Sequence, residues 1–127
     1  MTAPRLRIAG TVLSTRDAQA LATFYERFLG WPRLVDEPGW VILRPEGVDH
    51  GLSFHTDVEY VPPRWPSEPS AQLMMAPIDI ATDDLDGAVT HAIDCGASLA
   101  DHQPQDGVRV MLDPDGHPFC LFPSQFV

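Results

Sequence analysis

The chain contains the stretch Asp113-Pro114-Asp115-Gly116-His117-Pro118-Phe119-Cys120 near its C-terminus. A proline presets the φ angle at the second position of a turn, and a glycine accepts a φ that residues with a Cβ resist. The flanking segments, Val108 to Leu112 and Phe119 to Phe122, are short and apolar. The stretch is therefore predicted to be the turn of a β-hairpin.

This hairpin ends the second of two similar halves. In the first half, an apolar extended stretch at residues 7–14 precedes a helix and three strand-like segments, at residues 33–36, 40–43 and 51–55. In the second half, an apolar extended stretch at residues 73–81 precedes a helix and strands at residues 98–100, 108–112 and 119–122. The order of both halves is βαβββ, which predicts an α+β fold of two tandem modules.

The two predicted helices share a length and a pattern. Each runs thirteen steps from an acidic residue to a glycine, Asp17 to Gly30 and Asp83 to Gly96. Apolar residues recur in each at i, i+3, i+4, i+7 and i+8, the spacing of an amphipathic helix. These residues are Leu21, Phe24, Tyr25, Phe28 and Leu29 in the first helix, and Leu85, Ala88, Val89, Ala92 and Ile93 in the second.

Composition and charge limit the possible classes of protein. The 127 residues are 44% hydrophobic and 20% charged, which is typical of one globular domain. The formal net charge of -10 disfavours nucleic acid and anionic membranes as partners. The N-terminus lacks an apolar signal segment, so a cytoplasmic protein is expected. The two cysteines, Cys95 and Cys120, are expected to be reduced thiols.

A proline-rich segment, residues 58–72, separates the halves. It contains four prolines and no apolar periodicity, so an extended linker is predicted. Trp65 lies in its middle, where mere spanning needs no large aromatic side chain. Trp65 either anchors the segment to its own domain or covers a ligand site or a second subunit.

These features together resemble the glyoxalase/bleomycin-resistance/extradiol-dioxygenase superfamily, also called vicinal oxygen chelate, in its glyoxalase-like branch. The likeness is carried by the tandem βαβββ plan and by four motifs: Phe24-Tyr25 before Leu29-Gly30, Asp83-Asp84-Leu85-Asp86, the linker Val61-Pro62-Pro63-Arg64-Trp65-Pro66, and Asp113 to Cys120. It implies one domain, with module one at about 5–57, the linker at 58–72 and module two at about 73–127. The modules of such proteins form a curled mixed sheet with a U-shaped cleft, often completed by a second subunit, so a homodimer is expected.

The resemblance also implies where a metal ion would bind. Metal-dependent members carry one ligand, chiefly His or Glu, on the first and on the last strand of each module. These positions fall on Gly10, Ser53, Pro77 and Cys120, of which none is His, Asp or Glu. Glyoxalase I or extradiol dioxygenase chemistry is therefore not expected, and neither is a metal or other cofactor. A displaced metal site would have to use residues such as His55, Asp57 and Asp79.

The sequence thus favours a protein that binds a small organic ligand in its cleft without a metal, by sequestration as in bleomycin resistance. Seven residues are candidates for lining this cleft: Trp40, Phe54, His55, Trp65, Met75, Asp79 and Cys120. One alternative is a metal-dependent lyase or dioxygenase with a displaced metal site. Another is a protein whose dimer interface is its main working surface, with side chains filling the cleft.

Overall fold

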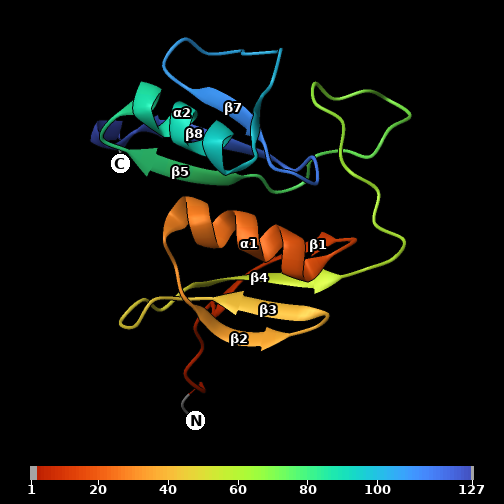
Figure 1. Ribbon diagram of the computed structural model, residues 1–127, viewed down its shortest axis with the longest axis vertical. Helices are drawn as coiled ribbons and strands as arrows, with labels where there is room; N and C mark the ends of the chain where they lie inside the picture. The colour runs from red at the N-terminus through yellow and green to blue at the C-terminus, as the bar shows by residue number, and fades with distance from the viewer. Residues whose placement is uncertain (1–2, 127) are drawn as a thin grey trace. The chain divides into compact units, whose positions relative to one another are not determined.

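The computed structural model describes residues 3–126, which divide into two units between Val58 and Glu59. Each unit has one helix and a four-stranded mixed sheet (Figure 1). The first contains β1 (Gly10–Thr15), α1 (Ala18–Leu29), β2 (Arg33–Glu37), β3 (Trp40–Leu43) and β4 (Gly51–Thr56), with sheet order β1-β4-β3-β2. The second contains β5 (Ile78–Thr82), α2 (Leu85–Cys95), β6 (Ser98–Leu99), β7 (Arg109–Leu112), β8 (Pro118–Pro123) and a 3-10 turn (Ser124–Phe126), with order β5-β8-β7-β6. The predicted tandem βαβββ plan of an α+β fold is confirmed.

Both helices begin and end as their sequences predict, with one shift. The side chain of Asp17 accepts a hydrogen bond from the Ala20 amide at 3.1 Å and caps α1, which ends at Gly30 with a φ of 70°. In α2 the capping residue is Asp84 rather than Asp83, because its carboxylate reaches the Gly87 amide at 3.0 Å. Each cap satisfies an amide that has no partner within the helix.

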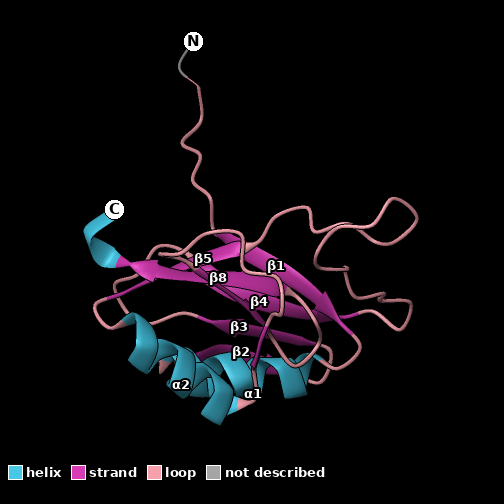
Figure 2. Cartoon of the chain, turned by 90° about the horizontal axis from the view of Figure 1, so that it is seen from above, coloured by secondary structure: helices cyan, strands magenta, loops and turns pink. Residues whose placement is uncertain are grey.

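The core of the first unit lies between α1 and one face of its sheet (Figure 2). Leu13, Phe54 and Val41 are register partners on β1, β4 and β3, so their side chains share this face. Phe54 is fully buried and stacks on Tyr25 of α1, with ring centroids 5.4 Å apart. The apolar stripe of α1 thus covers alternate residues of the strands.

In the second unit a helix also packs on one face of the sheet, but it buries fewer of its side chains. Met111 and Phe119 are register partners, and both are fully buried, as is Leu121. In α2 only Ala92 is buried, and Ile93 is 47% exposed. Since a helix covers a sheet only as far as its apolar face extends, most of this core depends on the β7-β8 hairpin.

The turn of this hairpin confirms the prediction from Asp113 to Cys120. The Gly116 amide donates to the Asp113 carbonyl at 2.9 Å, and Gly116 has a φ of 89°, in the left-handed region. The Asp113 side chain, 4% exposed as a residue, accepts from the amides of Asp115 at 2.9 Å and His117 at 3.0 Å. The aspartate therefore organises the turn from inside it.

Two strands begin several residues later than predicted, and the strands predicted at 98–100 and 108–112 are each one residue shorter. The structure begins β1 at Gly10 rather than Arg7, because β4 starts at Gly51 and offers the residues before Gly10 no partner beyond one bond to the Ala9 carbonyl. Similarly, residues 73–77 form no strand, since β8 pairs only with residues 78–82. A strand needs a neighbour, and apolar composition alone does not supply one.

The proline-rich segment is attached to the second unit. Tyr60 stacks on His117 with ring centroids 5.1 Å apart, and its hydroxyl donates to the Asp115 carbonyl at 3.2 Å. Trp65 donates from Nε1 to the His102 carbonyl at 3.1 Å. The segment is therefore held against the hairpin turn and against the loop before β7.

Candidate ligand-binding face

The face of the first sheet that α1 does not cover carries polar and aromatic side chains in rows. One row contains Ser14, His55 and Trp40, which are register partners across β1, β4 and β3. His55 is exposed and Trp40 is partly exposed. We call this uncovered side of the first sheet the open face. It offers a flat indole beside an imidazole and a hydroxyl, a combination suited to an aromatic or amphipathic small molecule.

A second row on the open face contains Val12, Ser53 and Ile42. Val12 is 54% exposed, although it is a large apolar residue in the middle of a strand. Of this row, only Ser53 was predicted from the sequence, as a position where relatives would carry a metal ligand. Strand register decides which side chains are neighbours, so Ser14, Val12 and Ile42 could be found only by aligning the three strands.

In the second unit, Asp79 of β5 and Cys120 of β8 are register partners. Their side chains alternate with those of Phe119 and Leu121, which are fully buried, so they lie on the other side of this sheet. Burial, and secondly the negative charge of Asp79, raises the pKa of the Cys120 thiol. At neutral pH this thiol is therefore mainly protonated, which makes it a poor nucleophile.

Three other residues predicted to line the cleft lie neither on the open face nor beside the Asp79–Cys120 pair. Phe54 lies on the helix-covered face, so of the neighbours Phe54 and His55 only the histidine faces outward. Met75 is 83% exposed in the loop before β5. Trp65 packs with His102, its ring centroid 5.7 Å from that of the histidine, as an anchor to its own unit would.

Comparisons with known proteins agree with this architecture. The sequence profile of a family described as "Glyoxalase-like domain" matches residues 10–122. The chain belongs to this family. The glyoxalase-like chain is thus a member of the vicinal oxygen chelate superfamily. A search of curated protein sequences found no match.

Among solved structures, this glyoxalase-like chain resembles TnmS3, an antibiotic-binding protein from Streptomyces sp. CB03234, with 19% identity over 96% of this chain and 98% of that one and a TM-score of 0.64. It also resembles a glyoxalase/bleomycin resistance protein/dioxygenase family enzyme from Burkholderia phytofirmans PsJN, at 21% identity over 89% and 94%, with a TM-score of 0.62. Lactoylglutathione lyase from Agrobacterium tumefaciens is similar at 14% identity over 98% of both chains, with a TM-score of 0.61. At such low identity these likenesses show a shared fold.

The four positions where the resemblance places metal ligands carry no histidine, aspartate or glutamate in this glyoxalase-like chain, and the structure shows the surroundings of each. A Cβ placed on Gly10 would lie 2.6 Å from the Gly51 carbonyl oxygen, closer than real Cβ atoms approach, so a histidine there would displace the backbone. Pro77 precedes β5 and offers no side-chain donor atom, and Ser53 is buried. Cys120 offers a thiol in place of an imidazole or a carboxylate.

The displaced metal site also finds no support in the described geometry. Within residues 3–126, no three side chains of His, Cys, Asp or Glu lie close enough together to hold a metal ion. His55 and Asp57 lie on and just after β4 without a third donor. A structural or catalytic ion usually takes at least three protein ligands.

Among residues 3–126, no helix is long and apolar enough to cross a bilayer.

Proposed function

We propose that this glyoxalase-like protein binds a small organic molecule on the open face of its first sheet and sequesters it without a metal-dependent reaction. The observation that carries the proposal is the row of Ser14, His55 and Trp40, of which the first two are exposed and the tryptophan is partly exposed, on a sheet whose other face is a packed core. Large aromatic side chains left accessible in a rigid sheet bind flat ligands with little loss of conformational entropy.

Two further observations support binding over catalysis. The positions where relatives would hold a metal carry Gly10, Ser53, Pro77 and Cys120, and Gly10 has no room for a side chain. The likeness to TnmS3, which is described as an antibiotic-binding protein, shows that this fold accommodates a binding role. We extend the proposal to one glyoxalase-like domain made of both modules and the intervening segment, acting as a homodimer in the cytoplasm.

The test uses ¹H–¹⁵N NMR of uniformly labelled protein, because the chain contains three tryptophans whose indole signals serve as separate reporters. Bleomycin, berberine, phenylacetate, benzylamine and benzyl alcohol are titrated one at a time. We expect at least one compound to shift the indole signal of Trp40 and the amide signal of His55, while the indole signal of Trp65 stays in place.

The matched variants are His55→Ala and His102→Ala. Both remove one exposed imidazole, but only His55 lies on the open face. The first should weaken binding of the responding compound about tenfold, the loss of one good polar contact, and the second should leave it unchanged. If no compound in the panel moves the Trp40 signal, or if both variants weaken binding equally, the proposal is wrong.

A further inference from the structure

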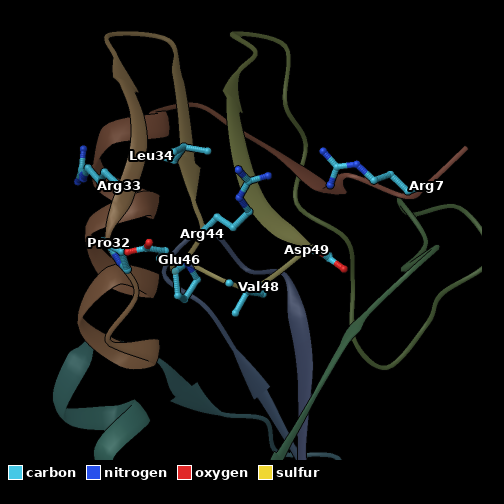
Figure 3. Close-up of a pocket in the computed structure, with 10 residues that line it drawn as sticks. Arg7, Pro32, Arg33, Leu34, Arg44, Glu46, Val48 and Asp49 are labelled. Carbon is cyan, nitrogen blue, oxygen red and sulfur yellow. The ribbon is translucent and has the colours of Figure 1, made fainter. Parts of the chain in front are cut away.

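A pocket of about 670 Å³ adjoins the open face in the first unit (Figure 3). Its volume lies within the range of roughly 300–1,000 Å³ typical of small-molecule sites. Its lining combines charged and apolar side chains from the N-terminal segment, β2 and the β3-β4 loop: Arg7, Pro32, Arg33, Leu34, Arg44, Pro45, Glu46, Gly47, Val48 and Asp49. Three of the eight basic residues of an acidic chain thus surround one pocket.

The three arginines differ in what they already bind. Arg33 is engaged, since its guanidinium lies 3.3 Å from Glu26 and 3.2 Å from Asp36. Within residues 3–126, the guanidinium groups of Arg7 and Arg44 have neither an ion pair nor a hydrogen bond. In Figure 3 the ends of these two side chains point toward one another, and Leu34 lies beside Arg44. Two unengaged guanidinium groups in one pocket are a strong attraction for an anionic group.

The position of Arg44 connects the pocket to the open face. A Cβ on Gly51 would lie 3.2 Å from Ile42 Cγ2 and 3.6 Å from the Cβ of Arg44, so both side chains rise on the same side of the sheet. Gly51 and its register partner Gly10 contribute no side chains. Because Ile42 lies on the open face, Arg44, the residue that follows β3, lies on this face as well.

The loop that forms the pocket wall is fixed at several points. The Arg44 amide donates to the Pro32 carbonyl at 3.1 Å, and the Val48 amide donates to the Pro45 carbonyl at 3.3 Å. Gly47, at the turn, has a φ of 81°. Because the loop is held by hydrogen bonds in this shape, a ligand would not have to order it.

From this arrangement we infer that the pocket binds the carboxylate of a small organic acid, with Arg44 and Arg7 as its partners and the apolar part of the acid against Leu34 and Val48. A planar guanidinium can give two parallel hydrogen bonds to a carboxylate. Leu34 is 53% and Val48 38% exposed, so both offer apolar surface for a ligand to cover. The inference goes beyond the proposed function, because the pocket is lined by other residues than the row of Ser14, His55 and Trp40 and can be tested apart from it.

Glu46 and Asp49 line the same pocket, and their negative charges would repel a carboxylate. They would instead favour an amine, and an amino acid would satisfy both kinds of group. The chemistry shared by the acid and the amino acid is the carboxylate, which the two arginines recognise. The experiment therefore has to compare a carboxylate, an amine and a neutral compound of the same aromatic body.

The test titrates phenylacetate, benzylamine and benzyl alcohol into the labelled protein and follows the amide signals of Leu34 and Val48 and the Nε–H signal of Arg44. We expect phenylacetate to shift these signals at least tenfold more strongly than either other compound at equal concentration. Phenylalanine, added as a fourth compound, shows whether an amine beside the carboxylate strengthens or weakens binding. Equal or stronger shifts with benzylamine would overturn the inference and assign recognition to Glu46 and Asp49.

The variants Arg44→Gln and Arg7→Gln should each weaken phenylacetate binding about tenfold, the effect of removing one charged hydrogen-bonding partner. Arg5→Gln is the matched control, because it makes the same charge change in the same exposed segment and does not line the pocket. If Arg5→Gln weakens binding as much as Arg7→Gln, only diffuse charge attracts the acid and the inference is overturned. The Trp40 indole signal reports on the open face separately: pocket signals that move without it support the pocket and count against the open face, and the reverse result counts against the pocket alone.

Discussion

Replacing Asp113 with alanine should destabilise the second unit more than any other single change in the hairpin turn. The carboxylate is inaccessible to solvent as a side chain, and it accepts from the amides of Asp115 and His117. His117 Nδ1 lies 2.8 Å from its Oδ2. A carboxylate can only accept, so the imidazole carries its proton on Nδ1. Three donors therefore lose their partner in Asp113→Ala.

The magnitude follows from these three contacts. A hydrogen bond to a charged group contributes about 1.5–3 kcal/mol, but both amides lie in a partly exposed turn where water can replace the carboxylate. We therefore expect Asp113→Ala to lower the free energy of unfolding by about 3 kcal/mol in total. For a chain of this size, that corresponds to a fall in Tm of roughly 10 °C.

The assay is urea unfolding followed by circular dichroism, with Asp113→Asn as the control. Asparagine keeps one oxygen for the two amides and changes only the contact with His117, so its cost should be about 1 kcal/mol. In a double-mutant cycle, His117→Ala should cost at least about 1 kcal/mol less when Asp113 is already alanine. An Asp113→Ala protein within about 0.5 kcal/mol of the parent, or an asparagine variant as unstable as the alanine one, would refute the reasoning.

Three other predictions follow from the same structure. In a Cys95→Ser chain, Asp79→Asn removes a negative charge that raises the pKa of Cys120, so alkylation of this thiol by iodoacetamide should reach half its maximal rate at a lower pH; an unchanged profile would mean that burial alone sets the pKa. Phe54→Ala should lower the free energy of unfolding in urea by about 3–5 kcal/mol, because this side chain is fully buried. His55→Ala, at an exposed position on the same strand, should change it by less than about 1 kcal/mol. Similar losses of stability in the two variants would contradict the assignment of these residues to opposite faces of the sheet. Sedimentation equilibrium should give twice the chain mass of 14.0 kDa, and a monomer at micromolar concentration would contradict the proposed homodimer.

The elements that local sequence determines were predicted well. The helix from Asp17 to Gly30 has its own cap, apolar stripe and terminal glycine, and the hairpin turn has its own proline, glycine and aspartate. Each of these signals acts over a few residues, so no distant partner is needed to read it. The family resemblance rests on the same local motifs and was confirmed.

Features that depend on distant partners were not predictable in the same way. Phe54 and His55 are neighbours with opposite surroundings, and only the register with Val41 and Trp40 decides which of them faces the helix. Met75 lies in an apolar run that lacks a partner strand. The same reason explains why the arginine pocket was missed, since it joins residues from three separate segments that have no common motif.

The close approach of Gly10 to Gly51 prevents a metal-binding side chain at position 10, and this bears on the kind of small molecule that we propose is bound nearby. A metal ion at such a site would attract the oxygens of a substrate and also act as a Lewis acid on them. In this chain, the Gly51 backbone leaves no room for a side chain at Gly10, and the nearby positive charge comes from Arg44, whose Cβ lies 3.6 Å from the position of a Cβ on Gly51. A guanidinium attracts and orients a carboxylate through charge and N–H donors, but it has no empty coordination position with which to polarise a carbonyl. An acid bound by Arg44, as we propose, would therefore be held and oriented without such polarisation.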